Sequence, residues 1–209
     1  MTAPTPRRKR PVKPEAEKAA DRLRRQQVKK RGERWQDMLA AGFEALTAPH
    51  DIDKVEPPVK IIRPLGAGRY EVVFTRSGDA DFRGGYRGII TAVEAKDTAA
   101  DQLELREIDD AQSDALARVH RQGGIALVAV RFGDESACRA WALPWATVAA
   151  MRAAGKRVVT ERELAAGEFE AYLIRVCVFC GDRVALLDQL MEESLFNLPS
   201  AVREMAGRG

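Results

Sequence analysis

The stretch GGYRGIITAVEAKDT, residues 84–98, decides the fold, because its apolar, β-branched run ends in charged residues. The alternation predicts a β-strand over residues 88–96, with polar side chains only at its end. Successive side chains of a strand point to opposite faces, so Glu94 and Lys96 share one face. An acid and a base at the close of an apolar strand cost burial free energy unless something uses them. We therefore expect a functional site at this end of the strand.

The segments that follow this strand predict an α/β domain. Residues 109–124 predict a helix that Asp109 or Asp110 caps and that ends at Gly123. The continuous apolar run IALVAVRF, residues 125–132, predicts a central strand buried on both faces. Further strands and short helices are predicted at 139–143, 144–155, 160–167 and within 170–195.

The segments that precede the strand predict a long helix and a hairpin. Helix-forming residues run from Glu15 through residue 47, and Gly32 is the expected boundary between a solvated part and a docked part. The docked part carries an apolar stripe at helical spacing, made of Trp35, Met38, Leu39, Phe43 and Leu46. Residues 59–63 and 66–75 predict the two halves of a β-hairpin.

Charge divides the chain into a basic arm and an acidic body. Residues 1–34 hold 13 Lys or Arg against 4 Asp or Glu, and the remainder holds 21 against 27. An arm of this kind usually meets a polyanion, although a merely solvated tail has the same composition. We expect a partly disordered arm at 1–30, a catalytic domain at 31–195 and a tail at 196–209.

Composition excludes several classes of protein. Apolar residues make up 45% of the 209 residues, which is enough for a buried core. No apolar run approaches the ~20 residues that cross a bilayer, and we expect no secretory signal, because no apolar stretch follows the amino-terminal RRKR. Three unevenly placed cysteines argue against a disulfide scaffold. We therefore expect a cytoplasmic protein without a membrane partner.

Two carboxylates can converge at the end of the decisive strand. Asp81 lies on the preceding polar loop, thirteen residues before Glu94. Two carboxylates that meet repel each other unless a cation lies between them, and oxygen ligands suit Mg²⁺. Lys96 beside such an ion could orient a water molecule or neutralise charge on a transferring phosphate. The alternative is a surface Glu–Lys pair on a strand, since this motif is short and chance matches are common.

The wider context resembles the RecU-type Holliday junction resolvases. In that family a Y-R-G strand runs into E-A-K, followed by a glutamine-bearing helix, G-G-I and an apolar strand that ends in R-F. The corresponding segments here are GGYRGIITAVEAKDT and DDAQSDALARVHRQGGIALVAVRF. The resemblance covers residues 59–143 with good spacing, and 31–58 and 144–190 more loosely. It implies a restriction-endonuclease-like mixed β-sheet flanked by helices, with a projecting β-hairpin stalk and a basic N-terminal arm.

The resemblance also implies roles for the charged residues of the site. Asp81 and Glu94 would be metal ligands and catalytic residues, and Lys96 would stabilise the transition state. Gln112 would be a third ligand from the helix, although its interval from Glu94 is about one residue shorter than the family pattern. Asp79 stands where the family has a threonine, and it is either a further ligand or a solvent-facing acid.

Two other features of the family are only partly matched. Its first helix carries an acid after an R-G pair, and here both Glu33 and Asp37 qualify. Its stalk corresponds to residues 64–80, which would enter the junction. The side chains expected to bind DNA are Arg69, Arg76, Tyr70 and Phe74 of the stalk, Arg83, Arg87, and Arg7, Arg8, Lys9 and Arg10 of the arm.

The activity implied is Mg²⁺-dependent cleavage of four-way junction DNA by a homodimer, with Mn²⁺ expected to substitute for Mg²⁺. Two sites related by a twofold axis suit paired symmetric nicks during recombination and repair. A recombinase is a further candidate partner, and the protein would act at the nucleoid. Two alternatives remain open: a nuclease of the same fold acting on linear, flap or nicked DNA, and a non-catalytic DNA-binding scaffold.

Overall fold

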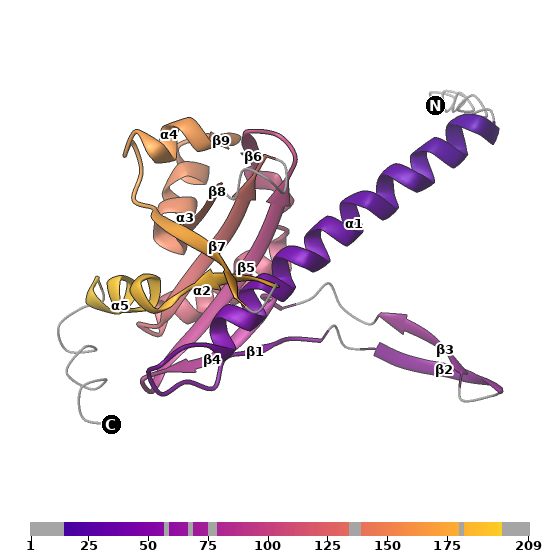
Figure 1. The fold of residues 1–209 in the computed structure, drawn as a ribbon, viewed down its shortest axis with the longest axis horizontal. Coiled ribbons are helices and arrows are strands. Elements are labelled where there is room, and N and C mark those ends of the chain that lie inside the picture. The colour runs from indigo at the N-terminus through magenta and orange to yellow at the C-terminus, as the bar shows by residue number, and fades with distance from the viewer. Residues whose placement is uncertain are drawn as a thin grey trace, which may run out of the picture.

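A computed structural model describes most of the chain (Figure 1), namely residues 15–56, 59–66, 69–74, 79–133, 139–179 and 182–197. Its centre is a mixed seven-stranded sheet, in which only the central pair is parallel. In spatial order the strands are β1 (Asp53–Lys54), β4 (Phe82–Tyr86), β5 (Ile89–Thr98), β7 (Ile125–Phe132), β8 (Arg139–Pro144), β10 (Tyr172–Phe179) and β11 (Asp182–Leu186).

Helices cover both faces of this sheet. One face packs against α1 (Glu15–Glu44) and α5 (Asp188–Phe196), and the apolar stripe expected on the first helix is buried there. The other face packs against α2 (Asp110–Arg121) and α3 (Trp145–Ala153). A small pair of strands, β6 (Gln102–Glu104) and β9 (Val158–Thr160), adjoins this second layer together with the short helices η1 (Leu105–Glu107) and α4 (Glu161–Ala165). The expected mixed sheet flanked by helices is therefore confirmed.

The central strands follow from their sequence. All eight residues of β7 are buried, as the continuous apolar run predicts. The strand pairs in parallel with β5 and antiparallel with β8, and α2 makes the crossover that a parallel pair requires. The crossover returns the chain so that the carboxyl ends of β5 and β7 lie side by side. This edge is where Glu94 and Lys96 were expected to act.

The predicted helix ends are confirmed at α2 and α4. Asp109, rather than Asp110, caps α2, and Gly123 follows that helix with a φ of 76°. Thr160 and Glu163 form the capping box of α4. Gly32 lies where the exposed part of α1 gives way to the part docked on the sheet, as expected, and the helix itself continues through this residue without a break. A β-carbon at Gly32 would meet nothing within 4 Å, so no close approach requires glycine there.

Two elements project from the body on the same side (Figure 1). One is the amino-terminal half of α1. The other is the hairpin of β2 (Val59–Gly66) and β3 (Arg69–Phe74), which begins before the expected stalk segment 64–80. Ala80 is fully buried and belongs to the body. Within the described residues, no helix is both long enough and apolar enough to span a membrane.

Candidate active site

Strand β5 carries an acid and a base into the interior. Glu94 lies opposite Val128 of β7, and its side chain is only 1% exposed. Lys96, two residues further along the same face, places its Nζ 2.9 Å from Oε1 of Glu94. The expected pair therefore exists, and its burial argues against an ordinary surface pair, because a buried charge is costly without a function or a partner.

The first turn of α2 adds an amide to this pair. Asp109 and Gln112 form a capping box, in which the Asp109 carboxylate accepts from the Gln112 backbone and the Gln112 Oε1 accepts from the Asp109 N–H, 3.0 Å away. The cap directs Gln112 toward β5. Its Nε2 donates to Oε1 of Glu94 at 2.5 Å, and its Oε1 accepts from Nζ of Lys96 at 3.1 Å. Helix capping and site geometry are thus set by one side chain.

The loop before β4 supplies the second carboxylate. The register of β4 against β5 pairs Phe82 with Val93, which brings the preceding residue, Asp81, beside Glu94. Backbone bonds hold this loop, since Asp81 O accepts from the N–H of Val55 at 2.7 Å. The Asp81 Oδ2 accepts from the N–H of Ala95 at 2.8 Å. Strand pairing therefore brings together two acids that are thirteen residues apart in the chain.

Helix α1 reaches the same site through a residue that sequence reasoning missed. Gln36 donates from Nε2 to Oδ1 of Asp81 at 2.9 Å. The two acids considered on this helix have other partners: Glu33 lies 3.6 Å from Lys29, and Asp37 lies 3.4 Å from Lys54 on the surface. The only indication in the sequence was the position of Gln36 on the helix, directly after the fully buried Trp35. A glutamine belongs to none of the motifs considered at that position.

Burial and mutual repulsion shift the acidity of the two carboxyl groups. Burial, followed by the negative charge of Asp81, raises the pKa of Glu94 to about 8, although Lys96 opposes the shift. Burial also raises the pKa of Asp81, and the Ala95 N–H and the Lys96 charge oppose it. In the metal-free protein the Glu94 carboxyl would therefore hold a proton near neutral pH, because its pKa is about 8.

These residues fit a divalent cation. Within the described part of the chain, Oε2 of Glu94 is buried and has no hydrogen-bond partner, although a carboxylate oxygen normally has one. No three Asp, Glu, His or Cys side chains converge among the described residues. The site instead offers two carboxylates beside an amide. That donor set suits Mg²⁺, which is usually bound through one or two carboxylates and keeps several waters.

Asp79 lies two residues before Asp81 in the chain and has its own partner. Its Oδ2 lies 2.5 Å from a guanidinium nitrogen of Arg83. Oδ1 is buried and has no hydrogen-bond partner among the described residues. Asp79 was expected as a possible metal ligand and Arg83 as a DNA contact, and the two instead pair with each other.

A buried ion cluster fastens α1 to the sheet next to the site. Asp97 and Arg131 lie directly opposite each other on β5 and β7, and both side chains are 2% exposed. Arg131 donates to both carboxylate oxygens of Asp97, at 2.9 and 3.0 Å. Arg31 of α1 donates two further bonds of 2.9 Å to the same carboxylate. Although burial alone would raise the pKa of Asp97, the two arginines lower it overall.

The other expected DNA contacts are not gathered at the site. Arg87 lies in the turn between β4 and β5, at the opposite end of β5 from Lys96, and pairs with Glu192 of α5 at 2.6 Å. The side chain of Arg69 lies outside the described part of the chain, and so do the side chains of Tyr70 and Phe74. Also outside it are Arg76 and Arg7, Arg8, Lys9 and Arg10.

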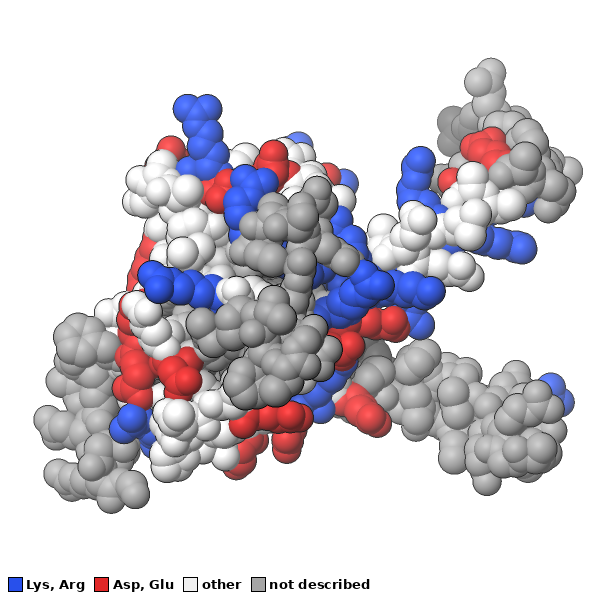
Figure 2. Space-filling view, in the orientation of Figure 1, with Lys and Arg blue, Asp and Glu red and all other residues white. Residues whose placement is uncertain are grey.

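Charge is unevenly spread over the visible face (Figure 2). Lys and Arg side chains follow the projecting part of α1 and gather where this helix meets the body. Asp and Glu side chains gather over α5 and below β1 and β4. The basic region adjoins the carboxylate site, because Gln36 and Arg31 lie on the same helix. An anionic substrate would therefore be attracted to this part of α1.

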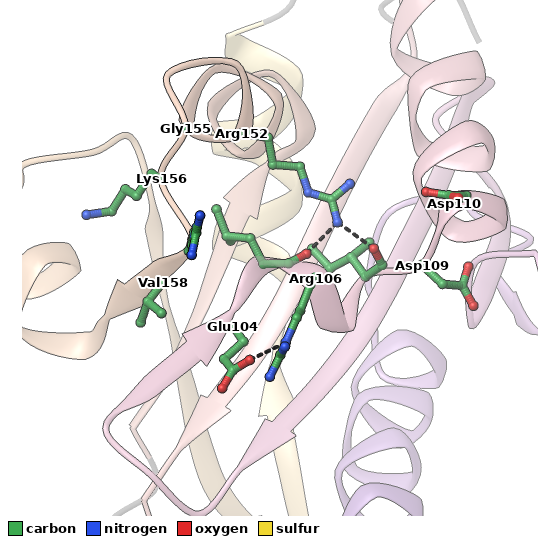
Figure 3. A pocket seen from close by; sticks show the side chains of 11 residues that line it. Glu104, Arg106, Asp109, Asp110, Arg152, Gly155, Lys156 and Val158 are labelled. Carbon is green, nitrogen blue, oxygen red and sulfur yellow. Dashed lines mark hydrogen bonds and ion pairs between the residues drawn. The ribbon is translucent and has the colours of Figure 1, made fainter. Parts of the chain in front are cut away.

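A hollow of about 970 Å³ lies beside the start of α2 (Figure 3). Its lining includes Asp109 and Asp110 but none of the four residues at the carboxylate site. In Figure 3, Arg152 points toward the η1 turn, where it donates to the carbonyls of Leu105 and Ile108. A third donation, to Ser113 Oγ at 2.6 Å, reaches α2 itself. Arg152 thereby holds the turn that delivers Gln112.

A comparison with protein families agrees with the earlier resemblance. The family model described as "RecU: Recombination protein U" matches residues 47–190, more than half of the chain. Among solved structures, the chain is similar to the Archaeoglobus fulgidus protein Hjc, which is titled a Holliday junction resolvase from an archaeal hyperthermophile. That match has 21% identity and a TM-score of 0.27, and it covers 41% of this chain and 63% of the other. No curated protein matches the sequence.

Proposed function

Because the chain belongs to the family of recombination protein U (RecU), we propose that it is a metal-dependent endonuclease that resolves Holliday junctions. One observation carries the proposal. Asp81, Glu94, Lys96 and Gln112 come from a loop, a strand and a helix, and they meet at one partly buried point. Two facing acids do not help the protein to fold. A metal-dependent phosphodiester hydrolysis, in contrast, needs them to hold the cation.

The proposed metal site consists of Asp81, Glu94 and Oε1 of Gln112, which would exchange its bond from Lys96 for the cation. A bound Mg²⁺, or Mn²⁺ in its place, would supply Lewis acidity and a more acidic water for attack on phosphorus. The ammonium group of Lys96 lies beside Glu94 and faces the same point, so it would orient the attacking water and offset charge on the phosphate. The sheet and α2 bury Glu94 and partly cover the other three residues, and a lower local dielectric strengthens each of these interactions.

The proposed substrate is a four-way DNA junction held between the two projections. The basic half of α1 would follow phosphates and contribute affinity without reading sequence. The hairpin would enter the junction on the other side of the site. A homodimer would present two such sites across a twofold axis, which suits paired symmetric nicks. We place this activity in the cytoplasm, at the nucleoid, where a recombinase would be a further partner.

The test is cleavage of an end-labelled mobile four-way junction, with and without Mg²⁺, beside a linear duplex and a flap of matched sequence. Paired symmetric nicks confined to the junction and dependent on Mg²⁺ would support the proposal. Equal cutting of the linear duplex or the flap would favour a general nuclease. Tight binding that is indifferent to Mg²⁺, with no products, would indicate a DNA-binding scaffold and would refute the proposal.

A further inference from the structure

We infer that Gln36 is a positioning residue for the metal centre, and that it holds the carboxylate of Asp81 in the orientation that receives the cation. The inference rests on the proposed function, because it concerns the same site. Its basis is the bond from Gln36 Nε2 to Asp81 Oδ1, 2.9 Å long, which crosses from α1 to the loop before β4. The two residues are 45 positions apart, so no local structure accounts for this contact.

The Asp81 carboxylate has two different anchors. Oδ2 accepts from the N–H of Ala95 at 2.8 Å, and Oδ1 accepts from Gln36 at 2.9 Å. With one donor on each oxygen, the group cannot rotate about its Cβ–Cγ bond without losing a bond. Each oxygen keeps a second lone pair for a cation. Without Gln36, only the backbone bond would remain, and the carboxylate could turn.

Gln36 is itself rigidly supported on α1. The preceding residue, Trp35, is fully buried and donates from Nε1 to the carbonyl of Ala129 at 3.1 Å. One turn earlier, Arg31 is bonded to Asp97 on β5. The helix therefore cannot slide or roll without breaking buried bonds. Groups that orient a metal ligand work best when their own position is fixed in this way.

The side chain of Gln36 is uncharged, and this property is as important for its role as its bond to Asp81. Asp81 and Glu94 are two acids that already face each other at this site. A carboxylate at position 36 would add a third negative charge to this site. An amide donates to Asp81 without adding charge, so the metal-free protein tolerates the arrangement. Gln36 thus holds the ligand while the number of carboxylates remains two.

The first test is Gln36→Leu, which removes the donor and keeps the volume and the helix propensity. Calorimetric titration of Mn²⁺ into the DNA-free protein should show about tenfold weaker binding, the usual loss when a group that orients a ligand is removed. Junction cleavage should lose kcat at saturating DNA, while KM for the junction stays unchanged. Unchanged Mn²⁺ affinity in a folded Gln36→Leu protein would overturn the inference.

The matched control is Gln189→Leu on α5. Gln189 also donates from Nε2 to a carboxylate, Oε1 of Glu193, at 2.6 Å, but on an exposed surface far from the site in sequence and in the fold. The control should bind Mn²⁺ and cut DNA like the wild type. If it weakened Mn²⁺ binding as much as Gln36→Leu does, the effect would be a general one of the substitution and the inference would fail.

Asp81→Asn separates failure of this inference from failure of the proposed function. Loss of Mn²⁺ binding in Asp81→Asn, with wild-type binding in Gln36→Leu, would overturn only the role of Gln36. Retained Mn²⁺ binding and cleavage in Asp81→Asn would overturn the metal assignment itself, and the inference with it.

A second variant, Gln36→Glu, tests the argument from charge. The third carboxylate should lower the Tm of the metal-free protein, because it faces Asp81 without a counterion. Mn²⁺ should then raise the Tm of Gln36→Glu by more than it raises that of the wild type. Equal Mn²⁺-induced shifts in the two proteins would show that position 36 does not sense the metal, and would overturn the inference.

Discussion

At the scale of single residues, Glu94 makes the stability of the metal-free protein depend on pH. Its folded-state pKa, about 8, lies above the ordinary value of 4.5, so the folded protein holds this proton more tightly than the unfolded chain does. The contribution of this bound proton to the free energy of unfolding is complete below pH 4.5. It declines as the pH rises toward 8 and is absent above that pH. A metal-free protein should therefore become less stable across this interval through this residue.

Glu94→Gln should remove that dependence. We expect the metal-free variant to be more stable than the wild type at about pH 8, by several degrees in Tm, and little different at about pH 5. The same variant should lose cleavage, because the buried oxygen would become part of an amide. Thermal unfolding in EDTA at both pH values checks the first statement, and junction cleavage checks the second. A variant less stable than the wild type at the higher pH would contradict the account of Glu94.

The sequence allowed most of this residue-scale detail to be predicted. Strand alternation predicted Glu94 and Lys96 on one face, and the resemblance to the family implied Gln112 as a ligand beside them. Gln36 could not be predicted, because its contact depends on how α1 lies across the sheet. Glu33 and Asp37 both matched the acid that the family carries on its first helix. Both pair with surface lysines instead.

At the scale of elements, the cluster of Arg31, Asp97 and Arg131 decides where α1 lies. Asp97→Asn would leave two arginines facing one neutral group, and Arg131 is almost completely buried. Breaking a buried ion pair in this way typically costs about 3–5 kcal/mol. We therefore expect urea unfolding to show a loss of that order. Asp101→Asn is the matched control, since Asp101 pairs with Arg139 on the surface and should lose no more than about 0.5 kcal/mol. Equal losses in the two variants would refute the anchoring role.

Most elements could be predicted from the sequence, but their anchoring could not. Periodicity and capping signals placed β5, β7, α2 and α4 correctly. The same patterns gave Asp97 and Arg131 no distinction from surface charges, because their pairing arises from the register of two strands joined through a helix. Arg31 joins them from 66 residues away, across a contact that only the tertiary structure creates.

At the scale of the whole molecule, the basic arm and the carboxylate site should be separable. Deleting residues 1–30 removes 11 of the 34 Lys and Arg residues and ends before Arg31, so the α1 anchor is kept. Junction affinity should fall, and the plot of log K against log salt should become less steep, by about 0.9 for each phosphate that is no longer neutralised. Binding of Mn²⁺ should be unchanged. Filter binding across a series of salt concentrations measures the slope, and an unchanged slope would reduce the arm to a spacer.

The division into a basic arm and an acidic body can be predicted from the composition. The direction in which the arm projects cannot. Counting charges separated an arm from a body. The structure adds that the basic half of α1 and the β2–β3 hairpin leave the body on one side (Figure 1). No local pattern could give the relative direction of two projections, because each is set by its own docking on the sheet.

Strand β7 has a consequence for how the protein survives heating. Its eight residues, Ile125–Phe132, are rich in β-branched and apolar side chains, contain no proline and carry a single charge, at Arg131. Such a segment is harmless in the centre of a sheet and prone to cross-β aggregation once it is released. Because it pairs in parallel through a helical crossover, it must wait for distant contacts before it is covered again. Unfolded chains should therefore aggregate faster than they refold at high concentration, and recovery after heating should improve with dilution or with a chaperone that shields this strand.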